Sequence, residues 1–263
     1  MNKPISIISW NVNSIKARLP NVLQFLRKHS PDIVLFQELK CVDDQFPAME
    51  IEDLGYNIAT NGQKTYNGVA IISKFPLSDV SRVLPGDPND TQARYVEAIA
   101  AAKTPIRVAS IYVPNGQSPD AEAFKYKLSF LDRLTKHAKN LLQYQEILVL
   151  GGDYNIAPTA LDVFNPKTLE GQICFHPEER KYFRQLINLG LTDAFRVIHP
   201  QAQSFSWWDY RAGSWDHNKG MRIDHLLLSP EAADILKDSR IISEERGREK
   251  ASDHAPVETT LTL

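Results

Sequence analysis

Residues 146–158 read EILVLGGDYNIAP, an apolar run that ends in two glycines and is followed at once by an aspartate and an asparagine. A short run rich in Ile, Leu and Val that stops at glycine is typical of a buried β-strand. Asp153 and Asn155 therefore lie where a buried strand ends. The same combination of buried strand and terminal polar residue recurs along the chain, and it decides both the fold and the candidate site.

Six further runs of this kind predict strands at 5–10, 32–37, 68–73, 106–113, 223–229 and 255–263. Apolar residues at spacings of three and four predict a helix over 121–142. Two more helices are expected at 19–29 and 177–190, because each has a proline near its start, and glycine closes the second. Strands alternating with helices favour an α/β fold in which two mixed β-sheets pack face to face and helices flank them. No low-complexity linker interrupts the pattern, so residues 1–263 are expected to form one domain.

The bulk composition sets few limits on function. Of 263 residues, 43% are hydrophobic and 24% are charged, which is ordinary for a globular protein. Cys41 and Cys174 have no metal-type spacing, and reduced thiols are favoured over a disulfide. No run approaches the roughly 18 apolar residues of a membrane span, and the first run is too short for a signal peptide. We expect a cytoplasmic protein without a membrane partner.

The net charge of −2 is a weak argument against a nucleic-acid partner. A nuclease that uses a metal ion must carry several carboxylates, and these cancel lysines and arginines elsewhere. The distribution of charge, which the sequence does not show, decides the matter.

Polar side chains gather where the predicted strands begin or end. They are Asn11, Asn13, Glu38, Asp153, Asn155, Asp224, Asp253 and His254. Taken singly, most could be turn formers or solvated acids. Asp224 is different, because it lies in a leucine-rich strand, where an unpaired carboxylate is costly. It requires a partner, and a histidine is the natural one.

Together these residue types suit metal-assisted hydrolysis of a phosphodiester. Mg²⁺ prefers one or two carboxylates plus waters, and it neutralises phosphate oxygens and the leaving alkoxide. An aspartate can orient or deprotonate the attacking water. A histidine that a carboxylate keeps protonated can donate to the developing negative charge.

The motifs also carry a family resemblance, which covers residues 9 to 257. In order they are SWNVNSIKAR, QELK, GQKTYNGVAI, YVPNG, GDYNIAP, GLTDAFR, FSWWDYR, RIDHLLLS and SDHAPV. The set resembles the exonuclease III family of abasic-site endonucleases, of the bacterial type, within the DNase I-like (endonuclease/exonuclease/phosphatase) superfamily.

The resemblance implies a four-layer αββα sandwich and a Mg²⁺ cofactor, with Mn²⁺ as a substitute. It implies cleavage of double-stranded DNA 5′ to abasic sites, removal of blocked 3′ ends and 3′–5′ exonuclease activity. A monomer is expected, associated with the nucleoid through its DNA substrate.

Carried over position by position, the resemblance assigns roles to the polar residues. Glu38 matches the metal-binding glutamate, Asn11 supports the same site, and Asp253 lies near the metal. Asp153 orients the attacking water, Asn155 and Tyr112 contact the phosphate or leaving group, and Asp224 pairs with His254. Asn13 departs from the animal-type enzymes, which have aspartate there, and this argues against direct metal ligation at that position.

Five residues are candidates for DNA binding. Trp207 matches an aromatic wall of the pocket for a flipped-out abasic sugar, which excludes a normal nucleotide by size. Met221 takes the other hydrophobic position, where relatives have Leu or Trp. Arg94, Lys125 and Lys127 are candidate phosphate contacts, although a solvated surface role is as well supported for these three.

Two other functions remain open at this level. The superfamily includes phosphodiesterases of lipid and inositol phosphates, and fold alone does not separate them from nucleases. The aromatic segment FSWWDYR and the loop QICFHPEERKYF favour DNA. A catalytically inactive DNA-binding copy is the second alternative, and the complete set of polar residues argues against it.

Overall fold

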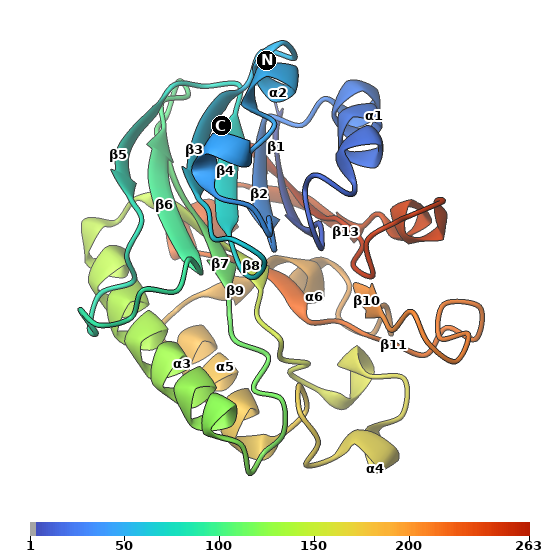
Figure 1. Cartoon of the computed structure of the whole chain (residues 1–263). Helices are drawn as coiled ribbons and strands as arrows, with labels where there is room; N and C mark the ends of the chain where they lie inside the picture. Colours follow the sequence, from blue (N-terminus) through green and yellow to red (C-terminus); the bar gives the residue numbers. More distant parts are fainter. Residues whose placement is uncertain (1–3) are drawn as a thin grey trace.

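The computed structural model describes residues 4–263. Within this range two six-stranded mixed sheets pack against each other, and helices cover both outer faces (Figure 1). The strand order is β13-β14-β1-β2-β4-β3 in the first sheet and β5-β6-β7-β8-β12-β9 in the second. The predicted α/β fold with an αββα arrangement is confirmed.

The first sheet is made of β1 Pro4–Asn11, β2 Ile33–Gln37, β3 Asn57–Asn61, β4 Val69–Ser73, β13 Leu236–Ile241 and β14 Val257–Thr262. The second is made of β5 Leu77–Ser81, β6 Tyr95–Ala100, β7 Ile106–Tyr112, β8 Ile147–Asp153, β9 Thr192–Asp193 and β12 Asp224–Leu228. A small hairpin pairs β10 Trp207–Trp208 with β11 Gly220–Met221. The α-helices are α1 Leu19–His29, α2 Ala48–Glu52, α3 Glu122–Leu141, α4 Pro166–Leu169, α5 Pro177–Asn188, α6 Ala194–Ile198 and α7 Pro230–Ala233. Short 3₁₀ turns span Asp43–Gln45, Leu142–Tyr144, Ala160–Asp162 and Ser243–Gly247.

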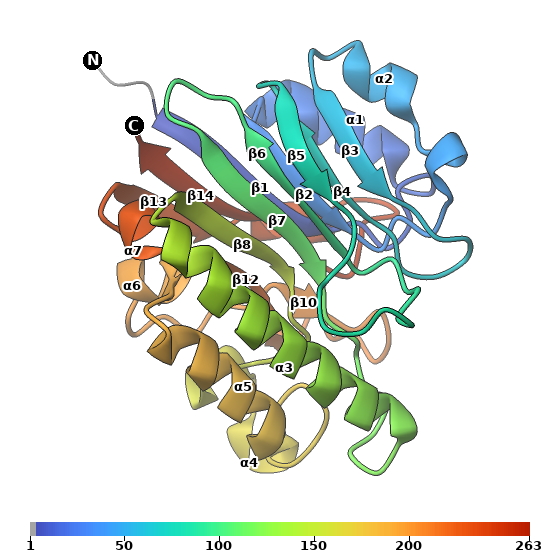
Figure 2. The ribbon, with the colours of Figure 1, turned by 90° about the vertical axis from the view of Figure 1, so that its left-hand side faces the viewer.

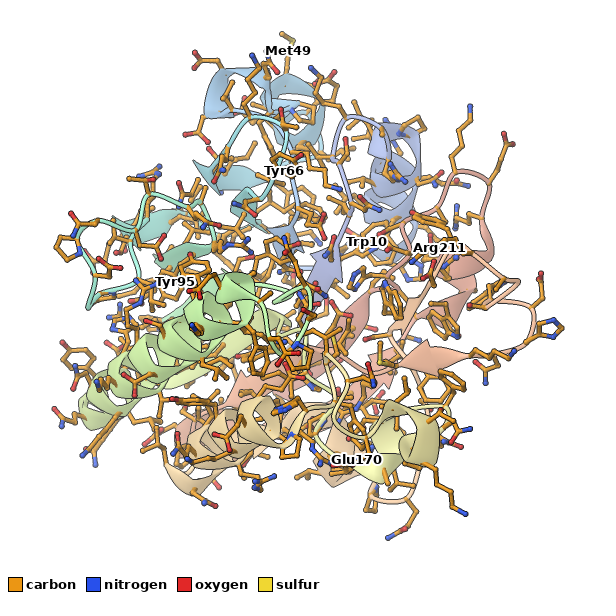
Figure 3. All side chains as sticks on the ribbon, turned by 60° about the horizontal axis from the view of Figure 1, so that its bottom comes forward. Trp10, Met49, Tyr66, Tyr95, Glu170 and Arg211 are labelled. Carbon is orange, nitrogen blue, oxygen red and sulfur yellow. The ribbon has the colours of Figure 1, made fainter. Side chains whose placement is uncertain are left out.

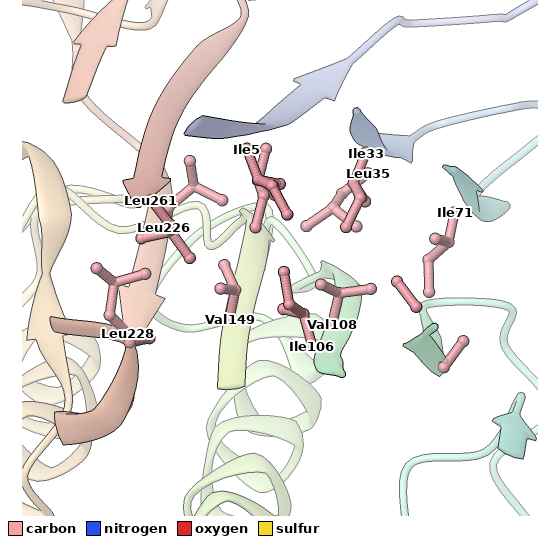
Figure 4. Close-up of a cluster of buried hydrophobic side chains, with 14 of the residues drawn as sticks. Ile5, Ile33, Leu35, Ile71, Ile106, Val108, Val149, Leu226, Leu228 and Leu261 are labelled. Carbon is pink, nitrogen blue, oxygen red and sulfur yellow. The ribbon is translucent and has the colours of Figure 1, made fainter. Parts of the chain in front are cut away.

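The main core lies between the two sheets (Figure 4). Leu35 of the first sheet and Val108, Val149 and Leu226 of the second are almost completely buried there. Burying a side chain of this size is worth about 1.5–3 kcal/mol. The contact between sheets therefore supplies a rigid platform on which the strand ends are fixed.

The helices bury the outer faces. In α1, Val22, Phe25 and Leu26 pack against the outer side of the first sheet around Trp10. The apolar stripe predicted over 121–142 is the buried face of α3, which lies with α5 against the second sheet (Figure 2). Each of these helices turns a hydrophobic face inward and leaves most of its charged residues in solvent.

Strand direction brings the polar ends together. β1 runs parallel to β2, and β7 runs parallel to β8, so the carboxyl ends of each pair meet at the same edge of their sheet. β12 is antiparallel to β8, and its first residue pairs with the last residue of β8. As a result Tyr112, Asp153 and Asp224 form one row across the second sheet. Figure 3 turns the bottom of Figure 1 forward, with Tyr66 and Glu170 on opposite sides of the view.

Strands that the sequence pattern did not predict lie mainly at sheet edges. β5 and β13 are edge strands with mostly exposed polar residues, so they lack the apolar run that marked the others. Both cysteines are free, as predicted, and both are buried. In the described part of the chain no helix has the length and apolar character required to cross a membrane.

Candidate active site

Two carboxylates and one imidazole converge at this edge. Glu38, Asp153 and His254 each offer one ligand atom, and these atoms lie within 4.8 Å of one another. The Asn11 side-chain amide donates to Glu38 Oε1 and to Asp153 Oδ2, both at 2.9 Å. Asn11 ends β1 in the first sheet and Asp153 ends β8 in the second, so this amide joins the two sheets at the site.

The backbone at three site residues adopts a left-handed conformation. φ is +45° at Asn13, +53° at Glu38 and +50° at Asn155. Asparagine tolerates this region, but for a glutamate it is an unfavourable conformation, of order 1–3 kcal/mol. Glycine would remove the strain but would also remove the carboxylate. In this conformation the Glu38 carboxylate accepts the hydrogen bond from the Asn11 amide.

Asp224 and His254 form the predicted buried pair. His254 Nδ1 lies 2.8 Å from Asp224 Oδ2, and Ser206 Oγ donates to the same oxygen at 2.6 Å. His254 Nε2 lies 3.7 Å from Asp153 Oδ2. Burial by itself lowers the pKa of His254, but Asp224 and Asp153 outweigh burial and raise the pKa to about 10. His254 is therefore an imidazolium at neutral pH.

The carboxylates have opposite pKa shifts. Burial raises the pKa of Asp153 to about 7, because the favourable fields of His254 and Asn11 offset the burial only in part. Burial also raises the pKa of Glu38, but Lys40 and the Asn11 hydrogen bond reverse the effect and hold it below its ordinary value. Lys40 Nζ lies 2.9 Å from Glu38 Oε2. A cation bound beside Asp153 would lower the pKa of that aspartate as well.

The donor set fits a hard divalent cation. Glu38 and Asp153 supply carboxylate oxygens, which Mg²⁺ and Mn²⁺ prefer. His254 is less suited to the role of ligand, because a metal-bound imidazole must be neutral. Asn11 orients both carboxylates through its amide nitrogen. The cluster can therefore hold a metal through the two acids, with His254 free to act as a donor.

A cavity of about 670 Å³ opens beside Glu38 and Tyr112. The Arg94 guanidinium lies 4.7 Å from the centre of the Tyr112 ring, and both residues line the cavity. Burial, together with Glu38 and Asp153, raises the pKa of the Tyr112 phenol well above its usual value. Tyr112 is therefore a neutral hydroxyl beside the acids, and Arg94 is a cation at the rim.

An apolar patch borders the site on the other side. Trp207 pairs with Met221 across the β10–β11 hairpin and forms an isolated bridge with His254. Met221 packs with Phe175 and Ile223, and Trp207 packs against this cluster. Asp253 lies outside the three-ligand group, and its oxygens accept hydrogen bonds from Asn13 at 2.9 Å and from Trp207 Nε1 at 3.0 Å. The structure thus places Asp253 where it holds the hairpin beside the site.

Lys125 and Lys127 lie in very different surroundings. Lys125 is exposed on α3 and pairs with Glu122. Lys127 is completely buried, which does not fit a contact with DNA phosphates or a solvated role. Its ammonium forms an ion pair with Glu179 and donates to the carbonyls of Asn155, at 2.7 Å, and Asn115, at 3.1 Å. The apolar spacing in α3 did not reveal that Lys127 is buried, because in a sequence a lysine looks like a surface cation.

Four residues inside the quoted motifs also contact the site but had no assigned role. Ser206 supports Asp224, and Lys40 neutralises Glu38. Asn115 donates to Asn155 Oδ1 at 3.1 Å, and Ser252 Oγ donates to the Asn11 carbonyl at 2.7 Å. Each lies within four residues of a predicted site residue or in a segment paired with one. Their places in QELK, YVPNG, FSWWDYR and SDHAPV were the only sequence signal.

Comparison with known proteins places this geometry in context. The model of the endonuclease/exonuclease/phosphatase family matches residues 8–254. Exodeoxyribonuclease III of Haemophilus influenzae is 35% identical over 96% of this chain and 98% of its own length. Two solved structures superpose closely over 98% of this chain and 100% of theirs. One is a 3′ phosphatase from Neisseria bound to a product DNA hairpin, with TM-score 0.94 and 39% identity. The other is an AP endonuclease from Archaeoglobus fulgidus, with TM-score 0.93 and 34% identity.

Proposed function

The chain belongs to the endonuclease/exonuclease/phosphatase family, and on that premise we propose that it is a Mg²⁺-dependent DNA-repair phosphodiesterase. It cleaves duplex DNA 5′ to abasic sites, leaves a 3′-hydroxyl, and removes blocked 3′ ends and 3′-terminal nucleotides. Residues 1–263 act as one catalytic domain, as a monomer in the cytoplasm, where the enzyme meets its DNA. Similarity to an exodeoxyribonuclease III, a 3′ phosphatase and an AP endonuclease supports this range of activities.

One observation carries the proposal: Asp153 and His254 are both buried, their side chains lie 3.7 Å apart, and they are suited to opposite proton-transfer roles. Asp153, with its raised pKa, sits next to His254, which Asp224 keeps charged. A carboxylate of this kind accepts a proton from water, and an imidazolium donates to a phosphate oxygen. Two groups with opposed protonation states at one pH are what phosphodiester hydrolysis requires.

The roles follow from the contacts. Asp153 orients and deprotonates the attacking water, and His254 donates through Nε2 to a non-bridging oxygen. Asp153 and Lys127 hold the backbone of Asn155, which fixes this residue beside Asp153, and we assign to it a contact with the phosphate. Tyr112 offers a hydroxyl near the leaving group. Glu38 and Asp153 would hold Mg²⁺, which would neutralise charge on the phosphate and on the departing alkoxide.

The apolar patch of Trp207 and Met221 favours an abasic sugar over a lipid or inositol phosphate. The patch is partly exposed beside His254, and Asp253 holds it in place by accepting a hydrogen bond from Trp207 Nε1. A sugar without a base fits an apolar wall of this size, and a normal nucleotide is excluded by its base.

A substrate panel tests the proposal. A labelled duplex with one abasic analogue is compared with an intact duplex, a 3′-phosphate duplex, an inositol polyphosphate and a sphingolipid phosphodiester, each with Mg²⁺ or EDTA. We expect Mg²⁺-dependent cleavage of the abasic and 3′-blocked duplexes, slower trimming of the intact duplex and no reaction with the other two. Faster turnover of the lipid or inositol compound would overturn the assignment to DNA.

A further inference from the structure

A second cavity, of about 400 Å³, lies beside the catalytic edge around Tyr210, and we call it the Tyr210 pocket. Its walls carry four cations and no carboxylate: Arg18, Arg246, Arg248 and Lys250, with Tyr210 and two alanines. Arg18 comes from the segment between β1 and α1, whereas the other three belong to the 3₁₀ turn Ser243–Gly247 and the segment that precedes β14. Residues more than 200 positions apart thus converge on one basic hollow.

Most of this positive charge is uncompensated. Arg248 pairs with Glu245, with Nη2 2.8 Å from Oε1. Among the ion pairs of residues 4–263, none involves Arg18, Arg246 or Lys250. Arg246 is only 9% exposed, and the Nε atoms of Arg246 and Arg18 are buried without a hydrogen-bond partner in the described chain.

A buried guanidinium without an acid is costly, so the pocket is suited to an anion. The Arg246 guanidinium lies 5.1 Å from the Tyr210 ring centre and 5.7 Å from that of Trp215. These contacts stabilise the charge, but they leave N–H donors unpaired. A phosphate has several acceptor oxygens and forms strong hydrogen bonds with guanidinium groups.

The pocket is joined to the catalytic residues through Tyr210. The Tyr210 hydroxyl accepts a hydrogen bond from Arg18 Nη2 at 2.9 Å and donates to the Ala251 carbonyl at 2.8 Å. The Asn13 amide lies 3.4 Å from the same hydroxyl and also donates to Asp253, the neighbour of His254. An anion in the pocket would therefore lie on the same edge as the phosphate that is cut.

We propose that the Tyr210 pocket binds a backbone phosphate of the DNA that flanks the scissile phosphate. The inference rests on the proposed function, because DNA is the ligand that places a second phosphate near the first. A duplex carries a negative charge about every 1.7 Å along its axis, so a strand held at His254 brings further phosphates past this hollow. The contact positions the duplex and does not read its sequence.

Arg18, which is partly exposed, and Lys250, which is exposed, allow a test that leaves the buried Arg246 in place. Arg18→Gln, Lys250→Gln and the double variant are compared with Lys139→Gln, which removes an exposed cation from α3 that lies outside the pocket. Binding of a labelled abasic duplex is measured by fluorescence anisotropy in EDTA over a range of salt concentrations. Each phosphate contact contributes about 0.9 to the slope of log Kd against log salt.

We expect each pocket variant to weaken binding and to reduce the slope by about one, and the double variant by about two. Lys139→Gln should match the wild type. An unchanged slope in the double variant, with wild-type DNA cleavage intact, would overturn the inference and leave the proposed function standing. A wild type that neither binds nor cuts DNA would instead overturn the proposed function.

Inorganic phosphate separates the DNA backbone from a free anion as the source of the ligand. Thermal unfolding of the wild type and of the double variant is measured with and without millimolar phosphate. In one outcome, phosphate stabilises the wild type but not the double variant, and the salt slope for DNA is the same in both proteins. The pocket would then bind a free anion and not DNA, and the proposal would be wrong. A reduced slope for DNA supports it whether or not free phosphate binds.

Discussion

The charge of His254 depends on carboxylates that it touches. Asp224 and Asp153 raise its pKa to about 10, while burial raises the pKa of Asp153 to about 7. The proposed mechanism requires the charged form of both groups. It should therefore rise as pH increases through the pKa of Asp153, shifted downward when metal is bound, and fall as pH approaches 10.

Asp224→Asn tests this pair. The loss of the carboxylate should lower the pKa of His254, so the alkaline limb of the kcat profile moves to lower pH. Rates for Asp224→Asn, His254→Asn and the double variant complete the cycle, and the double variant should be little slower than either single one. Fully additive losses, or an unmoved alkaline limb, would mean that the two residues act independently.

Trp207 tests selectivity at the same scale. Trp207→Ala should reduce abasic cleavage by about tenfold to over a hundredfold, since an aromatic contact with a nucleotide is worth about 1–3 kcal/mol. Trimming of an intact 3′ end should suffer less. Steady-state rates on the two substrates give the comparison, and equal losses on both would make Trp207 a structural residue only.

At the scale of elements, the Lys127–Glu179 pair fastens α3 and α5 to the two loops that carry Asn115 and Asn155. Lys127→Met leaves the Glu179 carboxylate buried without a cation and should cost about 3–5 kcal/mol of unfolding free energy. Lys127→Met combined with Glu179→Leu should recover much of that stability, because no charge is left unpaired. Denaturant unfolding measures both.

Activity separates positioning from stability in the same variants. The stable double variant should still have a lower kcat, because the Asn155 loop has lost its anchor. Lys136→Met, which breaks an exposed pair on the same helix, is the matched control and should change neither property. Wild-type kcat in the double variant would show that Lys127 contributes to folding alone.

The sequence predicted strands that carry long apolar or alternating runs. It missed mainly edge strands and two-residue strands, but also β6, a buried inner strand whose apolar run Glu97 interrupts. β8 and β12 have continuous apolar runs, whereas the edge strand β5 reads LSDVS and gives no such signal. The polar site residues were found because they lie where apolar strands begin or end. Lys127 was misread, because a lysine on the buried face of α3 looks like a surface cation until Glu179, 52 positions away, is seen beside it.

On the scale of the whole molecule, two packed sheets hold the site from both sides. Asn11 and Glu38 come from the first sheet, while Asp153 and Asp224 come from the second, so the site exists only when the sheets are packed. The net charge of −2 conceals a local separation of charge. Acids gather at the metal-type cluster, whereas the adjacent hollow around Tyr210 is lined by Arg18, Arg246 and Lys250, which form no ion pair within residues 4–263, and by Arg248.

The central claim is that Glu38 and Asp153 cooperate with Mg²⁺ in different ways to cut DNA beside an abasic site. Single-turnover cleavage of an abasic duplex, measured against Mg²⁺ concentration for the wild type, Glu38→Gln and Asp153→Asn, tests it most directly. We expect no cleavage by the wild type without metal. The Glu38→Gln curve should shift to higher Mg²⁺ concentration, because binding of the ion is weakened. Asp153→Asn should be nearly inactive at every Mg²⁺ concentration, because the water is no longer activated. Full rescue of Asp153→Asn by high Mg²⁺, or an unchanged curve for Glu38→Gln, would contradict the account.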